Sequence, residues 1–439
     1  MLPSRRAYGL LLLGMAIAPL FSLFWQAETQ IIASMLAIVA FDAVVLVLVA
    51  VDSSRVRGQR VQIHRHPLHR LSIGRDNPVM LSVQTGQHAA QVQIRDYHPL
   101  AIAASTSQLQ ARIEPNSTAD LSYTVHPTKR GEYQWGDIQI RQLGPWRLAW
   151  HDWTVPQAQT VAVYPDLIGL RALSIRLTLQ TAGAMRQARR LGIGTEFAEL
   201  REYATGDDPR LIDWKATARR SRPLIRVLEP EQEQTLLILL DRGRLMTAQV
   251  QGLSRFDWGL NATLSLAMAG LNRGDRVGVA VFDRQIHTWL PPERGQLQLS
   301  KLIERLTPIQ PELVEPDYFG AVTSLVNQQT RRALVVMITD IVDVTASAEL
   351  LAALGRLAPR YLPFCVTLRD PEVDRQAHAL TEDIPSTYAR AVALDLIAQR
   401  QTAFALLKQR GALVLDAPAN QISEQLVDRY LQIKAKSQL

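Results

Sequence analysis

Residues 192–231 read GIGTEFAELREYATGDDPRLIDWKATARRSRPLIRVLEPE, and the rest of the chain is organised around this segment. No other part of the sequence is as dense in glycine, paired acids, arginine and tryptophan. Gly192 and Gly194 permit positive φ angles and let other groups approach the backbone closely. Three acids follow at intervals of three residues, so a helix here would present them as one acidic stripe. These acids are Glu196, Glu199 and Glu202.

The second half of the segment predicts a turn followed by a helix. Residues 206–209 read GDDP, a combination of residues typical of turns. Asp208 is placed to cap a helix in which Pro209 occupies an early position, where proline is tolerated. That helix would carry Arg210, Asp213, Trp214 and Lys215. The charge pattern alone is equally typical of a salt-bridged surface.

The residue order G-x-G-x-E-F-x-x-L-R-E-Y-x-x-G-D-D-x-R-x-I-D-W-K-x-x-A-R resembles the family catalogued as domain of unknown function 58. This resemblance implies two membrane helices at the N-terminus, a β-rich region, the signature itself and a von Willebrand factor A-like domain. Members of the family are often found beside ATPases of the MoxR type, which implies a protein partner of that class. The resemblance implies no chemical activity.

The N-terminus predicts a helical hairpin in the membrane, residues 1–55. Tyr8–Trp25 contains no charge, and Ile31–Val51 contains only Asp42, so each stretch is long enough to cross a hydrocarbon core of about 30 Å. Asp42 is costly in lipid, and we expect it to face another helix. Arginines flank the outer ends of the spans at Arg5, Arg6, Arg55, Arg57, Arg60 and Arg65. The positive-inside rule therefore predicts a multi-pass inner-membrane protein with both termini and the soluble domains in the cytoplasm. A cleaved signal peptide is the rival reading, but no convincing small-x-small site follows Trp25.

Length and composition bound the remainder of the chain. A length of 439 residues predicts two or three domains, and the net charge is +7. This positive balance is compatible with nucleic acid or an anionic membrane, and membrane lipid is the simpler partner for an anchored chain. Cys365 is the only cysteine, which excludes internal disulfides and cysteine-based zinc sites. It lies in an apolar run, where a buried structural thiol is expected.

Residues 56–155 predict a β-sandwich-like domain, because short alternating runs are separated by turn residues. The predicted strands are 61–63, 79–83, 90–94, 121–125 and 137–141. His64, His66 and His69 cluster here without a patterned carboxylate or cysteine, so we expect a solvated strand end and not a metal site. Residues 156–234 form a connector and the signature segment, with a helix expected at 167–179.

Residues 235–439 predict a doubly wound α/β domain, the fold class that the resemblance calls von Willebrand factor A-like. Strands and helices alternate, and the apolar run 235–240 is typical of a central parallel strand. Further strands are expected at 276–282, 333–338, 361–368 and 412–415, and helices at 255–271, 297–306, 318–328, 346–357, 386–409 and 421–433. Asp241 and Asp340 follow two of the strands, at the edge where sites of such sheets lie.

The resemblance also implies a magnesium site, formed by D-x-S-x-S after the first strand with a Thr and an Asp from later loops. Residues 241–245 read DRGRL, so both serine ligands are missing, and residues 315–319 read EPDYF, without the threonine. We therefore expect no cofactor, with magnesium at Asp241 and Asp340 as the alternative. In its absence, we expect Asp241 and Asp340 to pair with Arg242, Arg244 or arginines of the signature.

No Walker A loop, nucleophile elbow or zincin pattern occurs in the sequence. We therefore predict a non-enzymatic, membrane-anchored adaptor that docks a protein partner, of the MoxR-type AAA+ class that the resemblance implies. Its process would be envelope-associated or chaperone-like. The alternative is a metal-dependent hydrolase or nuclease that uses the acids and bases of the signature. A nucleic-acid partner is not expected, because aromatic residues are not interleaved with the arginines.

The predicted docking surface is a structural clasp made by the signature on the A-like domain. Trp214 would be its buried apolar anchor, and Arg210 and Asp213 would each form an ion pair with a residue of another element. The residues assigned to this clasp are Glu196, Arg201, Asp207, Asp208, Arg210, Asp213, Trp214 and Lys215.

Overall fold

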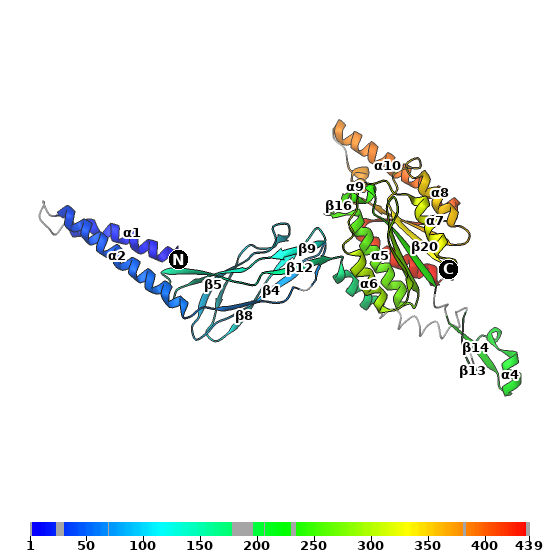
Figure 1. Cartoon of the computed structure of the whole chain (residues 1–439), viewed down its shortest axis with the longest axis horizontal. Coiled ribbons are helices and arrows are strands. Elements are labelled where there is room, and N and C mark those ends of the chain that lie inside the picture. The colour runs from blue at the N-terminus through cyan, green and yellow to red at the C-terminus, as the bar shows by residue number, and fades with distance from the viewer. Residues whose placement is uncertain are drawn as a thin grey trace. The chain divides into compact units, whose positions relative to one another are not determined.

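The computed structural model describes residues 2–22, 30–68, 70–177, 196–205, 207–229, 234–380 and 383–435. The chain divides into two compact units, Met1–Val163 and Tyr164–Leu439, whose elements are labelled in Figure 1. Together they make a mixed α/β protein. Gly192, Gly194 and His69, which the sequence singled out, lie outside the described residues.

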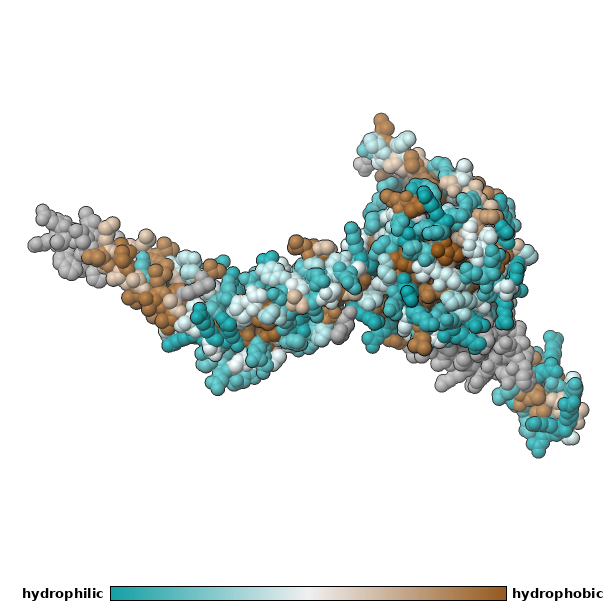
Figure 2. Space-filling view, viewed as in Figure 1, coloured by the Kyte–Doolittle hydropathy of each residue, from teal (hydrophilic) through white to brown (hydrophobic). Residues whose placement is uncertain are grey.

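The first unit begins with two apolar helices, α1 (Arg5–Ser22) and α2 (Gln30–Arg57). Within α2, the stretch Met35–Arg57 has a mean hydropathy of 2.6, and only 17% of its most apolar window is buried. It is the one helix among the described residues that is long and apolar enough to cross a membrane. This exposed apolar helix indicates association with a membrane. Figure 2 shows hydrophobic surface along the helices and hydrophilic surface over the β-rich part of the unit.

Asp42 of α2 lies against α1. A Cβ built on Gly14 of α1 would stand 3.2 Å from Asp42 Oδ1 and 2.5 Å from the Phe41 ring, so the two helices are in close contact there. This agrees with the expectation that Asp42 faces another helix.

The rest of the first unit consists of antiparallel sheets. A five-stranded sheet has the order β1-β11-β10-β5-β7, a four-stranded sheet β2-β4-β8-β6, and a three-stranded sheet β3-β12-β9. Burial alternates along the strands, as expected for sheets with one face in a core. The bounds are β1 (Leu2–Pro3), β2 (Gln62–Arg65), β3 (Leu71–Ser72), β4 (Asn77–Gln84), β5 (Ala90–Asp96), β6 (Ala103–Ala104), β7 (Leu109–Ile113), β8 (Thr118–His126), β9 (Gly131–Trp135), β10 (Ile138–Leu143), β11 (Ala149–Val155) and β12 (Gln159–Tyr164).

The second unit is built on a six-stranded sheet of order β19-β18-β15-β20-β21-β22, in which only the edge strand β19 runs antiparallel. The central strands are almost completely buried, as their unbroken apolar sequences predict. The strand bounds are β15 (Thr235–Asp241), β18 (Arg276–Phe282), β19 (Ile286–Glu293), β20 (Leu334–Thr339), β21 (Leu362–Arg369) and β22 (Leu413–Pro418).

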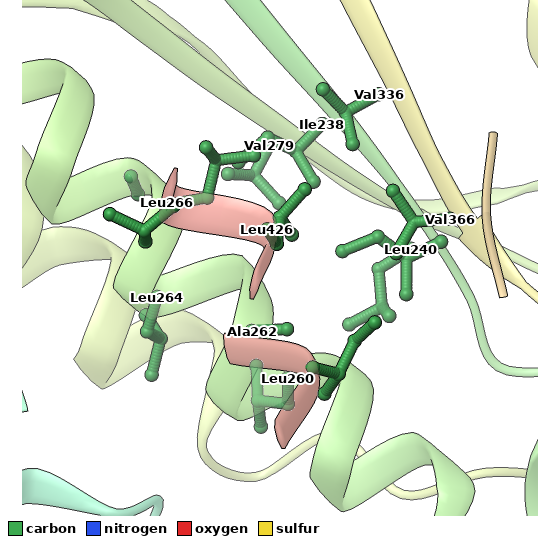
Figure 3. Packing of buried hydrophobic residues seen from close by; sticks show 14 of the residues in the cluster. Ile238, Leu240, Leu260, Ala262, Leu264, Leu266, Val279, Val336, Val366 and Leu426 are labelled. Atoms are coloured by element: carbon green, nitrogen blue, oxygen red, sulfur yellow. The ribbon is translucent and has the colours of Figure 1, made fainter. Parts of the chain in front are cut away.

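Helices cover both faces of this sheet, so alternate side chains of each strand enter different cores. Leu236, Ile238 and Leu240 of β15 pack in one cluster with α5 and α11 (Figure 3). Leu237 and Leu239 pack in the other cluster with α7, α8 and α10. The helix bounds are α5 (Arg255–Asn272), α6 (Gln296–Leu306), α7 (Tyr318–Gln328), α8 (Ala348–Leu357), α9 (Pro371–His378), α10 (Ile384–Gln409) and α11 (Ile422–Ala435). Residues 167–177, in the predicted connector helix, are also helical.

The signature forms a small hairpin, and its predicted acidic helix is wrong. Strand β13 (Glu196–Glu202) pairs antiparallel with β14 (Leu224–Glu229). Alternate residues of a strand point to opposite faces, so acids three residues apart share no stripe. The partner strand lies more than twenty residues downstream, and local spacing therefore gave no sign of the pairing. Between the strands are a 3₁₀ turn, η1 (Pro209–Leu211), and a short helix, α4 (Trp214–Arg220).

Candidate functional site

The carboxyl edge of the six-stranded sheet is the candidate site, and Asp241 stands at its centre at the end of β15. Its side chain is fully buried. It accepts hydrogen bonds from Thr339 Oγ1 at 2.7 Å, from Tyr318 Oη at 3.1 Å and from the Gly243 backbone N–H at 2.7 Å. Burial raises the pKa of Asp241 to about 6, although the three hydrogen bonds oppose this shift. The Asp241 carboxylate was a candidate metal ligand in the sequence, and in the structure it accepts hydrogen bonds from three uncharged groups instead.

Beside this carboxylate, the backbone at Gly243 has no room for a side chain. A Cβ built there would lie 2.8 Å from the Val314 carbonyl oxygen and 2.9 Å from Pro316 Cδ. Such contacts are shorter than those of real Cβ atoms. A serine ligand at this position would require the loop at 314–316 to move. Position 243 therefore lacks both a serine hydroxyl and the space for one.

Asp340 follows β20 and holds two arginines from different helices. Its side chain is 2% exposed. Arg255 Nη1, at the start of α5, lies 2.6 Å from Asp340 Oδ2, and Arg400 Nη1 of α10 donates to Asp340 Oδ1 at 2.8 Å. Arg400 Nη2 also donates to Asp416 Oδ1 at 2.8 Å. Burial alone would lower the pKa of Arg400, but Asp340 and Asp416 raise it.

A cavity of about 190 Å³ opens beside this ion-pair network. Three arginines, three aspartates and several apolar side chains line it, so its charge is balanced. The Nε atoms of Arg255 and Arg400 are buried and have no hydrogen-bond acceptor in the described part of the chain. The lining residues are Arg255, Asp340, Val342, Arg369, Asp370, Val373, Leu396, Ile397, Arg400, Gln401, Phe404 and Asp416.

The predicted pairing of Asp241 and Asp340 with Arg242, Arg244 or the signature arginines is wrong. Arg242 pairs with Asp283 at 2.7 Å and with Glu312 at 2.7 Å, while Arg244 pairs with Glu315 at 2.6 Å. The reason is topological, because the loop after β15 carries these arginines to acids that follow β18 or belong to the 312–315 segment. Within the described ranges no three His, Cys, Asp or Glu side chains are grouped as metal ligands.

Sequence analysis missed Tyr318, Thr339, Arg255, Arg400 and Asp416 as parts of this edge. Asp416 and Thr339 lie at the ends of parallel strands, so the rule that placed Asp241 and Asp340 there was sufficient to find them. The two arginines lie in helices distant in sequence, and no local pattern joins them to Asp340.

The signature acids mostly stabilise their own hairpin. Asp207 accepts two hydrogen bonds from Arg201, at 2.9 and 2.5 Å, and one from the Ala204 backbone N–H at 2.8 Å. The hydrogen bonds from Arg201 and then Ala204 lower the pKa of Asp207. Asp208 caps η1 by accepting from the Arg210 backbone N–H at 2.9 Å. It therefore begins a 3₁₀ turn, and the α-helix predicted directly after it is wrong.

Asp213 is the residue that caps the α-helix. It accepts from the Ala216 backbone N–H at 3.0 Å and from Arg226 Nε at 2.9 Å. The Ala216 N–H and then Arg226 lower the pKa of Asp213. Asp213 therefore forms an ion pair between elements, because β14 brings Arg226 to it.

Trp214 is 70% exposed, so its prediction as a buried anchor is also wrong. It is the first residue of a seven-residue helix that has no buried residue. Lys215 and Arg210 are exposed as well. The side chain of Glu196 lies outside the described side chains.

Comparison with known proteins identifies one domain. The family model "Protein of unknown function DUF58" matches residues 199–377. Residues 199–377 are a DUF58 domain. This DUF58 domain covers the hairpin from Glu199 onward and the sheet from β15 through β21.

The chain is similar to uncharacterized proteins. Those of Mycobacterium tuberculosis and Mycobacterium bovis are each 23% identical over 209 residues, which are 46% of this chain and 65% of the relative. The chain thus spans less than two thirds of their length. The uncharacterized protein YeaD of Bacillus subtilis is 25% identical over 142 residues, 32% of this chain and 33% of YeaD.

Two solved structures align with 46% of the chain and 99% of their own. The conserved hypothetical protein BatB from Bacteroides thetaiotaomicron is 17% identical, with a TM-score of 0.31. An aerotolerance-related membrane protein from Bacteroides fragilis is 14% identical, with a TM-score of 0.30.

Proposed function

We propose that this protein is a non-enzymatic adaptor, anchored in the cytoplasmic membrane, whose DUF58-containing unit docks a protein partner. In this proposal α1 and α2 form a membrane hairpin with both termini in the cytoplasm, followed by a β-sandwich-like domain. The six-stranded sheet is a von Willebrand factor A-like domain with a degenerate metal site. The partner is a MoxR-type AAA+ ATPase, and the process is envelope-associated or chaperone-like assembly.

The main support for the adaptor proposal is that both aspartates at the carboxyl edge of the sheet already have protein partners. Asp241 is bound by three neutral donors and Asp340 by two arginines. A hydrolytic site needs a free base, an activated nucleophile or a metal. Ligand pockets of enzymes usually enclose about 300–1,000 Å³, whereas the cavity here measures about 190 Å³. Its size and mixed lining fit a side chain of a partner protein better than a free substrate.

Trp214 supplies a second reason to propose docking. A large aromatic side chain that is 70% exposed has little use in a stable fold. Tryptophan and arginine are the residues most enriched at binding hot spots, and Arg219 and Arg220 lie in the same helix. We therefore replace the clasp hypothesis by a docking role for the exposed face of α4.

The test is crosslinking in membranes that contain the full chain, followed by capture and a search for an ATPase. The wild type is expected to capture the ATPase, and Trp214→Ala is expected to reduce capture about thirtyfold, the effect of losing a hot spot of 2 kcal/mol. Leu297→Ala is the control, because Leu297 is an equally exposed apolar residue at 79%. Equal capture by both variants, or capture without an ATPase, would contradict the proposal.

The hydrolase or nuclease alternative makes a different prediction for the same hairpin. If the signature acids act on a metal-bound substrate, Asp208→Asn and Asp213→Asn would abolish hydrolysis while partner capture stays normal. The adaptor proposal expects no hydrolytic activity in the wild type. It also expects both variants to capture the partner whenever α4 remains folded.

A further inference from the structure

Three chain segments meet at the base of the apolar helices in the first unit. Asp52, near the end of α2, is fully buried. It accepts hydrogen bonds from the backbone N–H groups of Trp146 and Leu148, both at 2.9 Å, and of Ala149 at 3.1 Å. Ser4, just before α1, donates from its hydroxyl to the Arg147 carbonyl oxygen at 2.6 Å. The helices are therefore joined directly to the turn before β11.

Six exposed arginines come from these three segments, and we call them the arginine collar. They are Arg5, Arg6, Arg55, Arg57, Arg60 and Arg147. Over the residues that the structure describes, none of them forms an ion pair with a carboxylate. The neighbouring acids have other partners, since Asp52 serves backbone amides and Asp152 pairs with Arg141 at 3.1 Å. Among the described residues, the six guanidiniums thus have no salt-bridge partner.

The collar also contains exposed aromatic surface. The guanidinium of Arg55 lies 4.2 Å from the ring centre of Trp146, which is 40% exposed, and that of Arg60 lies 5.3 Å from the ring of Trp153. Stacking holds these guanidiniums in place, and Arg60 Nη2 also forms a hydrogen bond with His151 Nε2 at 3.1 Å. Burial, together with the charges of Arg60 and Arg57, lowers the pKa of His151 at the same place. The imidazole therefore adds no positive charge at neutral pH.

The position of the collar along α2 is that of a membrane interface. Exposed apolar side chains continue to Val51, and Arg55 follows one helical turn later. One turn rises about 5 Å, which places the collar where hydrocarbon gives way to headgroups. Tryptophan and arginine are the residues typical of that layer.

We infer that the arginine collar binds the phosphates of anionic lipid headgroups and seats the β-rich part of the first unit on the membrane surface. Guanidinium groups match phosphate oxygens in a bidentate manner. Asp52 and Ser4 join the three segments that carry these arginines, so the backbone of the site is fixed before lipid arrives. This inference rests on the membrane anchoring proposed above and is independent of the ATPase partner.

The experiment uses the full chain in detergent, titrated with short-chain phosphatidylglycerol or phosphatidylcholine, with tryptophan fluorescence as the signal. Phosphatidylglycerol is expected to give a saturable change and phosphatidylcholine none. In Arg55→Gln/Arg57→Gln/Arg147→Gln the apparent affinity should fall about a hundredfold, since each arginine near an anionic surface contributes about a factor of five. The corresponding triple lysine variant keeps the charges and should retain most of the binding.

The matched control is Arg305→Gln/Arg331→Gln/Arg332→Gln, which removes three exposed charges elsewhere and should bind as the wild type does. Wild-type affinity in the glutamine collar variant, or equal responses to both lipids, would overturn the inference. Displacement of the lipid by millimolar inorganic phosphate would reveal a general anion site and would also overturn it. Loss of the chain from alkaline-washed membranes would refute the anchoring itself, which separates the two failures.

Discussion

Asp340 is a buried carboxylate that pairs with two partly buried arginines, Arg255 and Arg400. Replacing it by asparagine leaves Arg255, and part of Arg400, without a counter-charge while both arginine side chains remain mostly buried. We expect Asp340→Asn to lower the free energy of unfolding by about 3–5 kcal/mol. The measurement is urea unfolding of the full chain in detergent. Its signal is the reaction of Cys365, the only cysteine, which is completely buried in β21 beside β20.

A surface pair provides the control for this prediction. Glu424 pairs with Arg176, and its side chain is 63% exposed. Glu424→Gln is expected to change the free energy of unfolding by less than about 1 kcal/mol. If Glu424→Gln and Asp340→Asn lower the free energy of unfolding equally, the Asp340 network stabilises the fold no more than a surface ion pair does.

Asp241 predicts a pH dependence of stability. Burial raises its pKa from 3.8 to about 6, so the folded chain holds this proton more tightly than the unfolded chain does. The contribution of Asp241 to stability is therefore fully present below about pH 4 and is lost as the pH rises through 6, by about 3 kcal/mol in total. Asp241→Asn has no titrating group here, so the difference between the two proteins should change by about 2.4 kcal/mol between pH 4 and 7. A constant difference would mean that Asp241 does not titrate in this range.

At the scale of the element, the hairpin of the signature depends on Asp213. Removing this cap in Asp213→Ala should destabilise α4 by about 1 kcal/mol. The lost pair with the half-exposed Arg226 adds little. Hydrogen exchange of residues 214–220 should become about fivefold faster. Trp214→Ala should leave the exchange unchanged, because Trp214 is exposed, and faster exchange in that variant would restore its role as a structural anchor.

The strands of the second unit were predictable to different degrees. Unbroken apolar runs predict β15 and β18, because a strand buried on both faces does not alternate apolar and polar residues. Strand β13 was predicted as a helix, because its acids match helical spacing and its partner β14 is remote in sequence. The site likewise contains residues that local sequence places and residues that only tertiary packing brings in. Chain order places Asp241 and Asp340 at strand ends, whereas Arg255 and Arg400 reach them only through packing of α5 and α10.

At the scale of the whole molecule, the basic flanks predict the orientation of the hairpin. Cysteine introduced in Thr29→Cys should react with an impermeant thiol reagent in intact cells, because the loop between the two spans is expected outside. Cys365 should remain unlabelled in the same cells. The counter-test is Ser107→Cys in the β-rich part, which should also stay unlabelled. Labelling at position 107 would place the soluble part outside the cytoplasm and overturn this topology.

The crowding at Gly243 has a consequence for how this protein can change over evolutionary time. A serine at 243 would meet the Val314 carbonyl oxygen and Pro316 before it met any ion. A mutation that introduces a hydroxyl here must therefore be accompanied by one that moves the 314–316 loop, and Tyr318 must also leave Asp241. Each of these steps alone loses packing and gains no ligand. Single substitutions in this sequence therefore do not create a magnesium site at this edge, and at least two changes must coincide.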